Sequence, residues 1–390
     1  RGELVARIRE DGPISFREFM DLALYHPRGG YYSAPARHRV GQEGDFITSV
    51  SVGRTFGRLL AHRIHQFWAA NRCPAELHLL EPGPEGGDLA LDILGEAKRA
   101  IPDLHKALHY HACEPAEGKR AALAKRLEEA GEPRTTVVGS PRELDPAGRD
   151  HECGTGPRTG IILANEVLDA LPVHLVRFEA GRWHERCVTF ADGRLAWELR
   201  ELVDGPLAEA VGQLGTRFPD AYDTEICLEQ PEFLAPLAAA FDHALFIFID
   251  YGFPRCDYYH PSRTDGTLRT YVRHQAGDDP LSSPGRQDLS VHVDFTRLLT
   301  SADALGLKPH GFTRQERYLT ALAEPLLTGL PSDSPDTTSF IRQFRTLTHP
   351  GMLGAAFHIL ELTKGPVNPS PEPFRFDPQG IRILTTPSLA

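Results

Sequence analysis

The stretch LHLLEPGPEGGDLALDIL, residues 77–94, decides the fold. It reads as an apolar strand that ends at Glu81, followed by a glycine-rich turn and an amphipathic helix. A strand, a glycine turn and a helix in this order form the corner of an α/β sheet where a nucleoside is held. The stretch therefore predicts an α/β domain with a nucleoside site.

The residues of the turn favour a ligand without phosphate. Gly83 and Gly87 lack a Cβ, so the backbone can take positive φ and lie directly against a ligand. Glu85 and Asp88 would repel a pyrophosphate, whereas the sulfonium of S-adenosylmethionine would be mildly attracted. The turn does not fit G-x-G-x-x-G, and the chain has no G-x-x-x-x-G-K-[ST]. We therefore expect S-adenosylmethionine rather than NAD or ATP.

A second acid supports this interpretation. The run LHYHACE, residues 108–114, reads as the next strand and ends at Glu114. If the two strands are parallel neighbours, Glu114 emerges beside the glycine turn, where its carboxylate can accept hydrogen bonds from both ribose hydroxyls. The alternative is that Glu114 only caps the helix that begins near Pro115.

Composition narrows the class of protein. The chain has 390 residues, 41% of them hydrophobic, which is enough for two or three domains or for one α/β core with insertions. Its net charge of −11 argues against general binding to nucleic acid or to an anionic membrane, and is compatible with a basic protein substrate.

Cysteine usage and hydropathy bear on the compartment. The six cysteines are scattered without a C-x-x-C pair, which predicts reduced thiols, and we find neither a signal peptide nor an apolar span of about 18 residues. We therefore expect a cytoplasmic protein. Because the chain begins at Arg1 rather than Met, a trimmed leader is left open.

The order of elements predicts a parallel sheet with helices on both faces. Helices are expected at 88–100 and 116–130, between strands of the sheet. The expected strands are 77–81, 108–114, 135–139, 160–164 and 244–250. Further helices near 294–305, 315–328 and 335–347 and closing strands near 308–313 and 355–363 complete this part of the chain.

Around this core we expect five parts. They are an N-terminal helical cap (1–72), a Rossmann-like core (73–172 and 240–365), an inserted antiparallel and helical subdomain (173–239), a long active-site loop (251–293) and a weakly structured tail (366–390). Loops as long as 251–293 are uncommon inside compact domains and are usually functional.

Several separate stretches together resemble one family, the MidA-like methyltransferases. The matching stretches are GPISFREFMDLALYHPRGGYYS (13–33), GDFITS (44–49), LLEPGPEGG (79–87), ANEVLDALPV (164–173), FIDYG (248–252), DGTLRTY (265–271) and PGRQDLSVHVDF (284–295). The resemblance implies a class I, Rossmann-like methyltransferase fold that uses S-adenosylmethionine. In the best-studied branch, which includes a mitochondrial complex I assembly factor, the substrate is a protein arginine.

The resemblance also implies site residues. The expected cofactor-binding residues are Gly44, Asp45, Thr48, Ser49, Glu81, Gly83, Gly87, Glu114 and Asn165. We expect Glu166 and Asp169 to be the catalytic pair, because two carboxylates can hold a planar guanidinium and orient its lone pair as the proton leaves. The alternative is that Glu166 binds only the cofactor and that Asp169 braces the next turn.

A further set is expected at the substrate, and each member has a structural alternative. Asp250 and Tyr251 end a strand, so a strand-end role is the alternative to a substrate contact. His292 and Asp294 close the long loop, and Asp294 is also placed to be the N-cap of the helix that follows. We expect no metal, since His105, His109 and His111 have no further ligand that completes a set.

The chain departs from the family pattern in three places. Glu85 stands where the glycine loop of the family has its middle glycine, which predicts either a positive φ at this residue or an obstructed approach to the methionine moiety. Val50 and Ser51 replace Pro-Glu, and Arg58 replaces a later Glu, so two acids that would meet a cationic substrate are missing.

These observations predict an S-adenosylmethionine-dependent methyltransferase that modifies a protein side chain. We expect no nucleic-acid or membrane partner, and a homodimer is left open. Two other functions are compatible with the sequence: a non-catalytic assembly protein with the same fold, and a small-molecule O- or N-methyltransferase.

Overall fold

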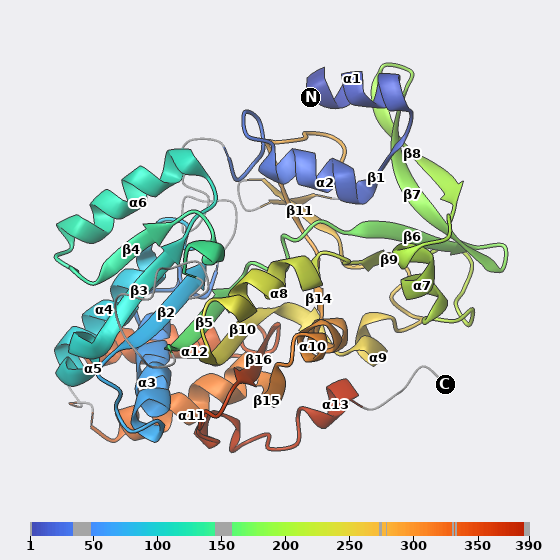
Figure 1. The fold of residues 1–390 in the computed structure, drawn as a ribbon. Coiled ribbons are helices and arrows are strands. Elements are labelled where there is room, and N and C mark those ends of the chain that lie inside the picture. Colours follow the sequence, from blue (N-terminus) through green and yellow to red (C-terminus); the bar gives the residue numbers. More distant parts are fainter. Residues whose placement is uncertain are drawn as a thin grey trace.

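The computed structural model describes residues 2–33, 48–144, 158–272, 275–277, 279–329, 331 and 334–385. Its centre is a mixed sheet in the order β4-β3-β2-β5-β10-β16-β15, with β14 beside the end of β10 (Figure 1). The strands are β2 (Leu77–Pro82), β3 (Leu108–Cys113), β4 (Thr135–Val138), β5 (Thr159–Asn165), β10 (His243–Phe253), β14 (Val293–Asp294), β15 (Lys308–Arg314) and β16 (Phe357–Lys364). Strands β4, β3, β2, β5 and β10 are parallel, as predicted, and β16 runs antiparallel to both of its neighbours.

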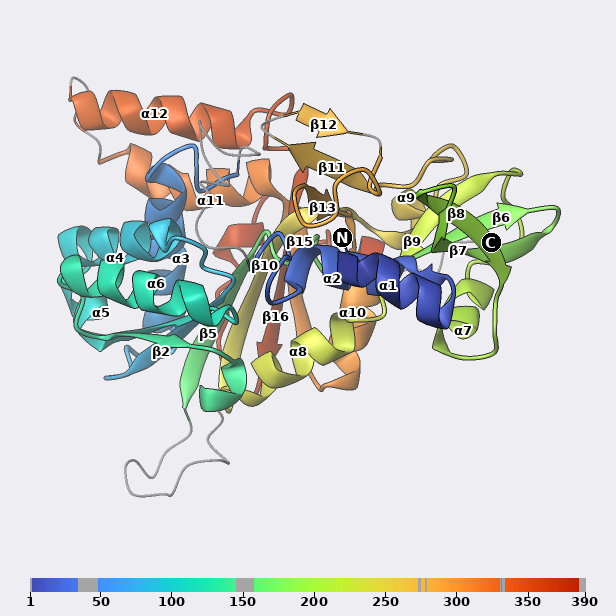
Figure 2. The ribbon, with the colours of Figure 1, turned by 90° about the horizontal axis from the view of Figure 1, so that it is seen from above.

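Helices cover both faces of this sheet (Figure 2). One face carries α3 (Thr55–Ala70), α4 (Asp88–Ala100), α5 (Pro102–Ala107), α6 (Glu117–Glu129), α11 (Gln315–Leu327) and α12 (Pro335–Thr348). The other face carries α8 (Gln230–Ala239) and α10 (Phe295–Ala304). Successive strand residues such as Leu79 and Leu80 are fully buried in the two different cores. The strands therefore read as continuous apolar runs, because both of their faces are covered.

The insertion contains a second, antiparallel sheet, as expected for residues 173–239. Its order is β1-β7-β6-β9, with β8 paired to β7. The strands are β1 (Ile14–Ser15), β6 (His174–Glu179), β7 (Arg182–Ala191), β8 (Arg194–Glu201) and β9 (Tyr222–Ile226). Helix α7 (Pro206–Gly212) lies between β8 and β9 in the chain and packs on this sheet. The N-terminal helices α1 (Gly2–Asp11) and α2 (Phe16–Tyr25) pack on this sheet, whereas α3 packs on the central one (Figure 1).

The segment 251–293 differs from the irregular loop that its composition suggested. Strand β10 continues to Phe253, and α9 (Arg255–Tyr258) follows. Strands β11 (Arg269–Val272), β12 (Gln275–Gly277) and β13 (Asp288–Ser290) then form a small antiparallel sheet. Strands of three or four residues among Pro and Gly are too short to show an alternating pattern.

The tail is also more ordered than expected. It contains η3 (Glu372–Phe374) and α13 (Arg382–Thr385), and Phe374 and Leu384 are buried against the central sheet layers. The helix α5 and the short η1 (Pro141–Leu144) were not predicted either. These pieces have only three to six residues, so tertiary packing rather than a periodic sequence pattern holds them in place.

Three findings concern the described residues as a whole. None of their helices combines the length and the apolar character that crossing a membrane requires. No group of three or more His, Cys, Asp or Glu side chains in them is placed to hold a metal ion. The five cysteines that lie in the described part are free thiols.

Candidate active site

The carboxyl ends of β2 and β3 bring the glycine turn and Glu114 together. The two strands are parallel neighbours with Glu81 opposite Ala112. The backbone N–H of Gly83 donates to the carbonyl of Cys113 at 3.1 Å, which holds the turn against the end of β3. The Tyr110 hydroxyl donates to Glu81 Oε2 at 2.7 Å, and burial raises the pKa of Glu81 to about 7.

The glycine turn has the backbone that its glycines allow. Gly83 and Gly87 have φ of 70° and 80°, in the left-handed region that L side chains avoid. A Cβ on Gly83 would lie 2.6 Å from Val167 Cγ1, so the turn packs tightly against the segment after β5. Glu85 has φ of 45°, which is the first of the two outcomes expected from its replacement of a glycine.

Glu114 lies where the sequence predicted, beside the glycine turn, and its carboxylate also bonds to the backbone before α6. Its Oε1 accepts the backbone N–H of Ala116 at 2.7 Å, at the start of α6. Its Oε2 is 4.0 Å from Lys119 Nζ. The carboxylate thus holds the residue before α6 while it stands at the end of β3, beside the glycine turn, and the N-cap of α6 is Ala116.

The turn after β5 carries the predicted catalytic pair. Glu166 has φ of 52°, a left-handed conformation that costs about 1–3 kcal/mol and that, outside ordinary turns, clusters at active sites. Its Oε1 accepts the backbone N–H of Ser49 at 3.1 Å and Asn165 Nδ2 at 3.2 Å. The backbone at Ser49, one of the expected cofactor-binding residues, is therefore bound directly to Glu166.

Asp250 organises this turn from the neighbouring strand. Its Oδ2 accepts the backbone N–H groups of Val167, Leu168 and Asp169 at 3.2, 2.9 and 3.3 Å. Its Oδ1 accepts the N–H of Tyr251 at 2.8 Å, and the side chain is fully buried. These contacts correspond to the strand-end alternative, in which Asp250 positions the catalytic turn instead of contacting substrate.

Asp169 is joined to β13, a strand that the sequence did not reveal. Its Oδ2 accepts the Ser290 hydroxyl at 2.8 Å, and its carbonyl accepts the N–H of Val291 at 2.9 Å. Asp288, two residues before Ser290, accepts the Tyr32 hydroxyl at 2.9 Å. Asp288 and Ser290 belong to the matching stretch PGRQDLSVHVDF, which was the signal that could have indicated them.

The pair Glu166 and Asp169 lies in a partly buried, negatively charged environment. Burial, together with the charge of Asp169, raises the pKa of Glu166 to about 8. Burial also raises the pKa of Asp169 to about 6. Among the described residues neither carboxylate has a Lys or Arg partner, whereas the buried Glu361 is paired with Arg63 at 2.7 Å. The site is thus suited to a cationic ligand.

Tyr251 and His292 lie together beside this pair. Their rings are stacked at 6.1 Å, and Tyr251 also packs on Phe357 at 3.9 Å. Burial raises the pKa of Tyr251, and the charges of Glu166 and Asp169 raise it further. Burial lowers the pKa of His292 to about 4, so the ring is neutral near pH 7.

Asp294 has the structural role that was the alternative to a substrate contact. It is the N-cap of α10, and its Oδ1 accepts the backbone N–H of Arg297 at 3.0 Å. Asp294 is buried, and its Oδ2 lies 3.8 Å from Arg255 Nε. The geometry therefore accounts for this acid as a helix cap next to the site.

The segment 44–51 is described only from Thr48 onward, so Gly44 and Asp45 lie outside the described residues. Thr48 and Ser51 bond to each other through backbone and hydroxyl groups, which closes a tight turn.

Arg58, where the family has an acid, bonds to Asp336 at 3.1 Å and lies over the Phe340 ring. Its guanidinium is thus engaged with α12 rather than with the catalytic turn.

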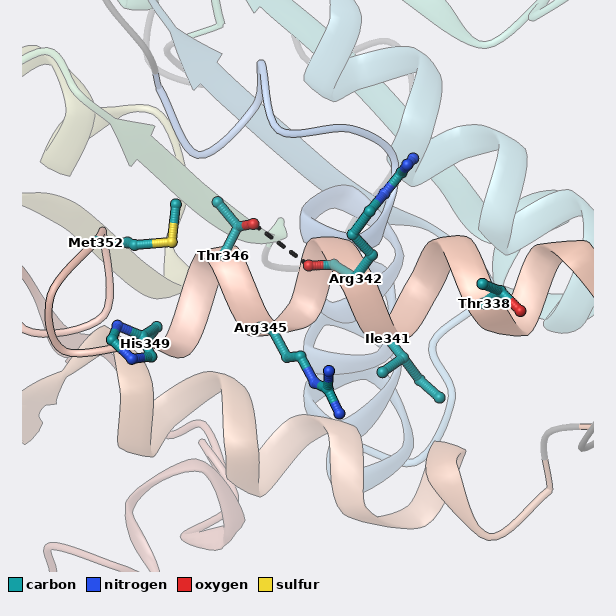
Figure 3. A pocket seen from close by; sticks show the side chains of 7 residues that line it. All are labelled: Thr338, Ile341, Arg342, Arg345, Thr346, His349 and Met352. Carbon is teal, nitrogen blue, oxygen red and sulfur yellow. Dashed lines mark hydrogen bonds between the residues drawn. The ribbon is translucent and has the colours of Figure 1, made fainter.

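A separate hollow of about 470 Å³ lies on the outer side of α12 (Figure 3). It is lined by Thr338, Ile341, Arg342, Arg345, Thr346, His349 and Met352. None of the predicted site residues lines it, and it contains no carboxylate. The hollow is therefore distinct from the candidate active site.

The arrangement fits a phosphate-free nucleoside. The glycine turn offers bare backbone, and Glu81 and Glu114 stand at two adjacent strand ends, where a carboxylate suits ribose hydroxyls. Asn165 Oδ1 is buried without a hydrogen-bond partner among the described residues, so it can accept a ligand N–H or O–H. Fold and site together define an α/β protein with a site for a phosphate-free nucleoside.

Comparisons with known proteins identify the family. Residues 59–313, more than half of the chain, match the model of a family described as "Putative S-adenosyl-L-methionine-dependent methyltransferase". The chain belongs to this family, and its cofactor is S-adenosylmethionine. A crystal structure from Burkholderia thailandensis with bound S-adenosyl-homocysteine has 28% identity and a TM-score of 0.81, and covers 96% of this chain and 94% of that one.

Two curated relatives are named as protein arginine methyltransferases. The NDUFAF7 homolog of Drosophila melanogaster is 29% identical over 93% of this chain and 84% of its own length. NDUFAF7 of Danio rerio is 30% identical over 76% of this chain and 70% of its own length. Both names also include the word mitochondrial.

Proposed function

We propose that this chain transfers a methyl group from S-adenosylmethionine to an arginine side chain of a protein. The observation that carries the proposal is the pair Glu166 and Asp169, two partly buried carboxylates without a Lys or Arg partner among the described residues. A guanidinium would supply the missing positive charge. The NDUFAF7 relatives, which are named as protein arginine methyltransferases, support the same acceptor.

In this proposal the residues of the chain bind, orient and accept a proton. Glu81, Gly83, Glu114 and Asn165 would hold the cofactor, which supplies a methyl group already activated by its sulfonium. Glu166 and Asp169 would hold the guanidinium in line with that methyl group, an alignment that can contribute about 7–11 kcal/mol. Because its pKa is raised to about 8, Glu166 is the carboxylate better suited to take the proton that the nitrogen loses.

A labelling experiment tests the proposal. The full chain would be incubated with S-adenosylmethionine carrying a labelled methyl group and with a lysate of the host cells, and the labelled material would be separated and hydrolysed. We expect label in methylated arginine of protein, and none with Glu166→Gln. Label only in low-mass material would indicate a small-molecule methyltransferase instead.

A calorimetric titration addresses the non-catalytic alternative. We expect S-adenosylmethionine to bind, since the family is defined by this cofactor. No detectable binding at millimolar ligand would favour an assembly protein that kept the fold without the activity. A cytoplasmic location and a homodimer stay predictions.

A further inference from the structure

Asp288 lies on the strand that is joined to the catalytic turn. It begins β13 and is 3% exposed. Residues i and i+2 of a strand face the same side, so Asp288 faces the same side as Ser290. Because the Ser290 hydroxyl donates to Asp169 Oδ2, that side is the one occupied by the catalytic turn.

Tyrosines of the N-terminal segment fix the orientation of Asp288. The Tyr32 hydroxyl donates to Asp288 Oδ1 at 2.9 Å. Tyr32 is stacked on Tyr25 with ring centroids 5.6 Å apart, and the Tyr25 hydroxyl donates to the carbonyl of Ala170 at 2.8 Å. The last residue of α2 is thus tied to the residue after Asp169, and the segment that follows α2 is tied to Asp288.

One oxygen of Asp288 is left to accept from a ligand. Among the described residues, its two hydrogen bonds, from Tyr32 and from the N–H of Leu289, both end on Oδ1. It has no Lys or Arg partner in that part of the chain either. A carboxylate that is buried without a cation loses much of its solvation energy, so a cation brought to it would be bound strongly.

Glu225 shows how a buried acid of purely structural role is satisfied in this protein. It is also buried without a Lys or Arg partner among the described residues. Its Oε2 accepts the hydroxyls of Tyr258 and Thr267, and its Oε1 accepts the N–H groups of Thr267 and Leu268. Both oxygens are therefore occupied, in contrast to Asp288.

The charges around Asp288 favour a cation as well. Burial, together with the negative charges of Asp169 and of Glu85 in the glycine turn, raises the pKa of Asp288 to about 7. Asp288 is therefore within electrostatic reach of both the catalytic turn and the cofactor turn. A guanidinium has five N–H donors in a planar fork. One oxygen of Glu166 and one of Asp169 already accept hydrogen bonds within the site, so a further carboxylate adds acceptors for this fork.

We propose that Asp288, oriented by Tyr32, is a third acceptor-binding carboxylate and that its Oδ2 makes the site select a guanidinium over a neutral group of the same shape. This inference rests on the proposed function, and it adds the residue that decides the charge of the acceptor. Tyr32 is a positioning residue, because it acts through Asp288.

The test compares a charged probe with a neutral one. The full chain, saturated with S-adenosyl-homocysteine, would be titrated with ethylguanidine and with N-ethylurea while ligand-observed NMR reports binding. We expect the unmodified protein to prefer ethylguanidine, and Asp288→Asn to lower this preference by about tenfold, the size of one charge-assisted hydrogen bond. Tyr32→Phe keeps the charge and should lower the preference by about threefold.

Glu225→Gln is the matched control, because it makes the same chemical change at a buried acid whose oxygens are both occupied. It should keep the preference, and all three variants should keep the affinity for S-adenosyl-homocysteine. The inference is overturned if Asp288→Asn and Tyr32→Phe keep the preference, if Glu225→Gln loses it equally, or if the unmodified protein has none. If the unmodified protein prefers ethylguanidine but the labelling experiment finds no label in protein arginine, the proposed function is wrong and the inference about Asp288 stands.

Discussion

Asp250 Oδ2 accepts the backbone N–H of Leu168 at 2.9 Å, and this bond joins the end of β10 to the turn that carries Glu166 and Asp169. Asp250→Asn replaces one of the two carboxylate oxygens by an NH₂ group, which cannot accept a hydrogen bond. Either the N–H groups of the catalytic turn or the N–H of Tyr251 would then lose their acceptor. We expect the free energy of unfolding to fall by about 2–4 kcal/mol, measured by chemical denaturation. Hydrogen exchange should become faster at residues 166–169.

Asp294→Asn is the control for this prediction. Asn is as good an N-cap as Asp, so the change at the start of α10 should cost less than about 1 kcal/mol. Equal losses in the two variants would contradict the special role that we assign to Asp250.

The role of Glu166 can be separated from cofactor binding. If Glu166 holds the acceptor and takes its proton, Glu166→Gln should lower kcat by about 10²–10⁴-fold while the Kd for S-adenosylmethionine changes little. Calorimetry and steady-state kinetics on one preparation provide both values. A large rise in Kd with an unchanged kcat would support the alternative, in which Glu166 binds only the cofactor.

The raised pKa of Glu166 also predicts how stability depends on pH. The folded-state pKa is about 8 and the unfolded value is 4.5, so between these values the folded state holds more protons than the unfolded state. The free energy of unfolding should therefore fall as pH rises through this window. Glu166→Gln removes this titration, so it should be more stable than the unmodified protein at pH 9, by at least about 1 kcal/mol, and not at pH 4. A constant difference at both pH values would contradict the assignment.

The contact between the glycine turn and the catalytic turn predicts a local cost. Gly83→Ala would place a Cβ 2.6 Å from Val167 Cγ1 at a φ of 70°. Gly193→Ala is the matched control, because Gly193 has φ of 78° and open space around it. Both should lose about 1 kcal/mol from backbone strain, and Gly83→Ala should lose about 1–3 kcal/mol more from the clash. Only Gly83→Ala should also weaken cofactor binding.

Replacing Glu85 of the glycine turn by glycine should increase stability, whereas Gly83→Ala should decrease it. Glu85 has φ of 45°, so Glu85→Gly should raise the free energy of unfolding by about 1 kcal/mol. Asp192→Gly, at a φ of 51° in the turn between β7 and β8, is the control for strain alone. If the charge of Glu85 attracts the sulfonium, Glu85→Gly and not Asp192→Gly should reduce the preference for S-adenosylmethionine over S-adenosyl-homocysteine.

The sequence predicted the central sheet well because long buried strands and amphipathic helices have strong local patterns. The run 244–250 became β10, and the run 108–114 became β3, a parallel neighbour of β2. It did not predict β11 to β13, whose three or four residues pair with one another. It also did not show that β1 extends the inserted sheet, since Ile14 opposite Val188 is a pairing distant in sequence.

The amino-acid sequence by itself determined the order of strands and helices, the glycine turn after Glu81 and the family, because these depend on neighbouring residues and on short motifs. Only the tertiary structure decided what each acid does. Asp250 and Asp294 were placed against backbone N–H groups, whereas Glu166, Asp169 and Asp288 were left without a cation among the described residues. The physical reason is that the state of a carboxylate depends on burial and on partners that come from distant segments, and neither can be read from its own position in the chain.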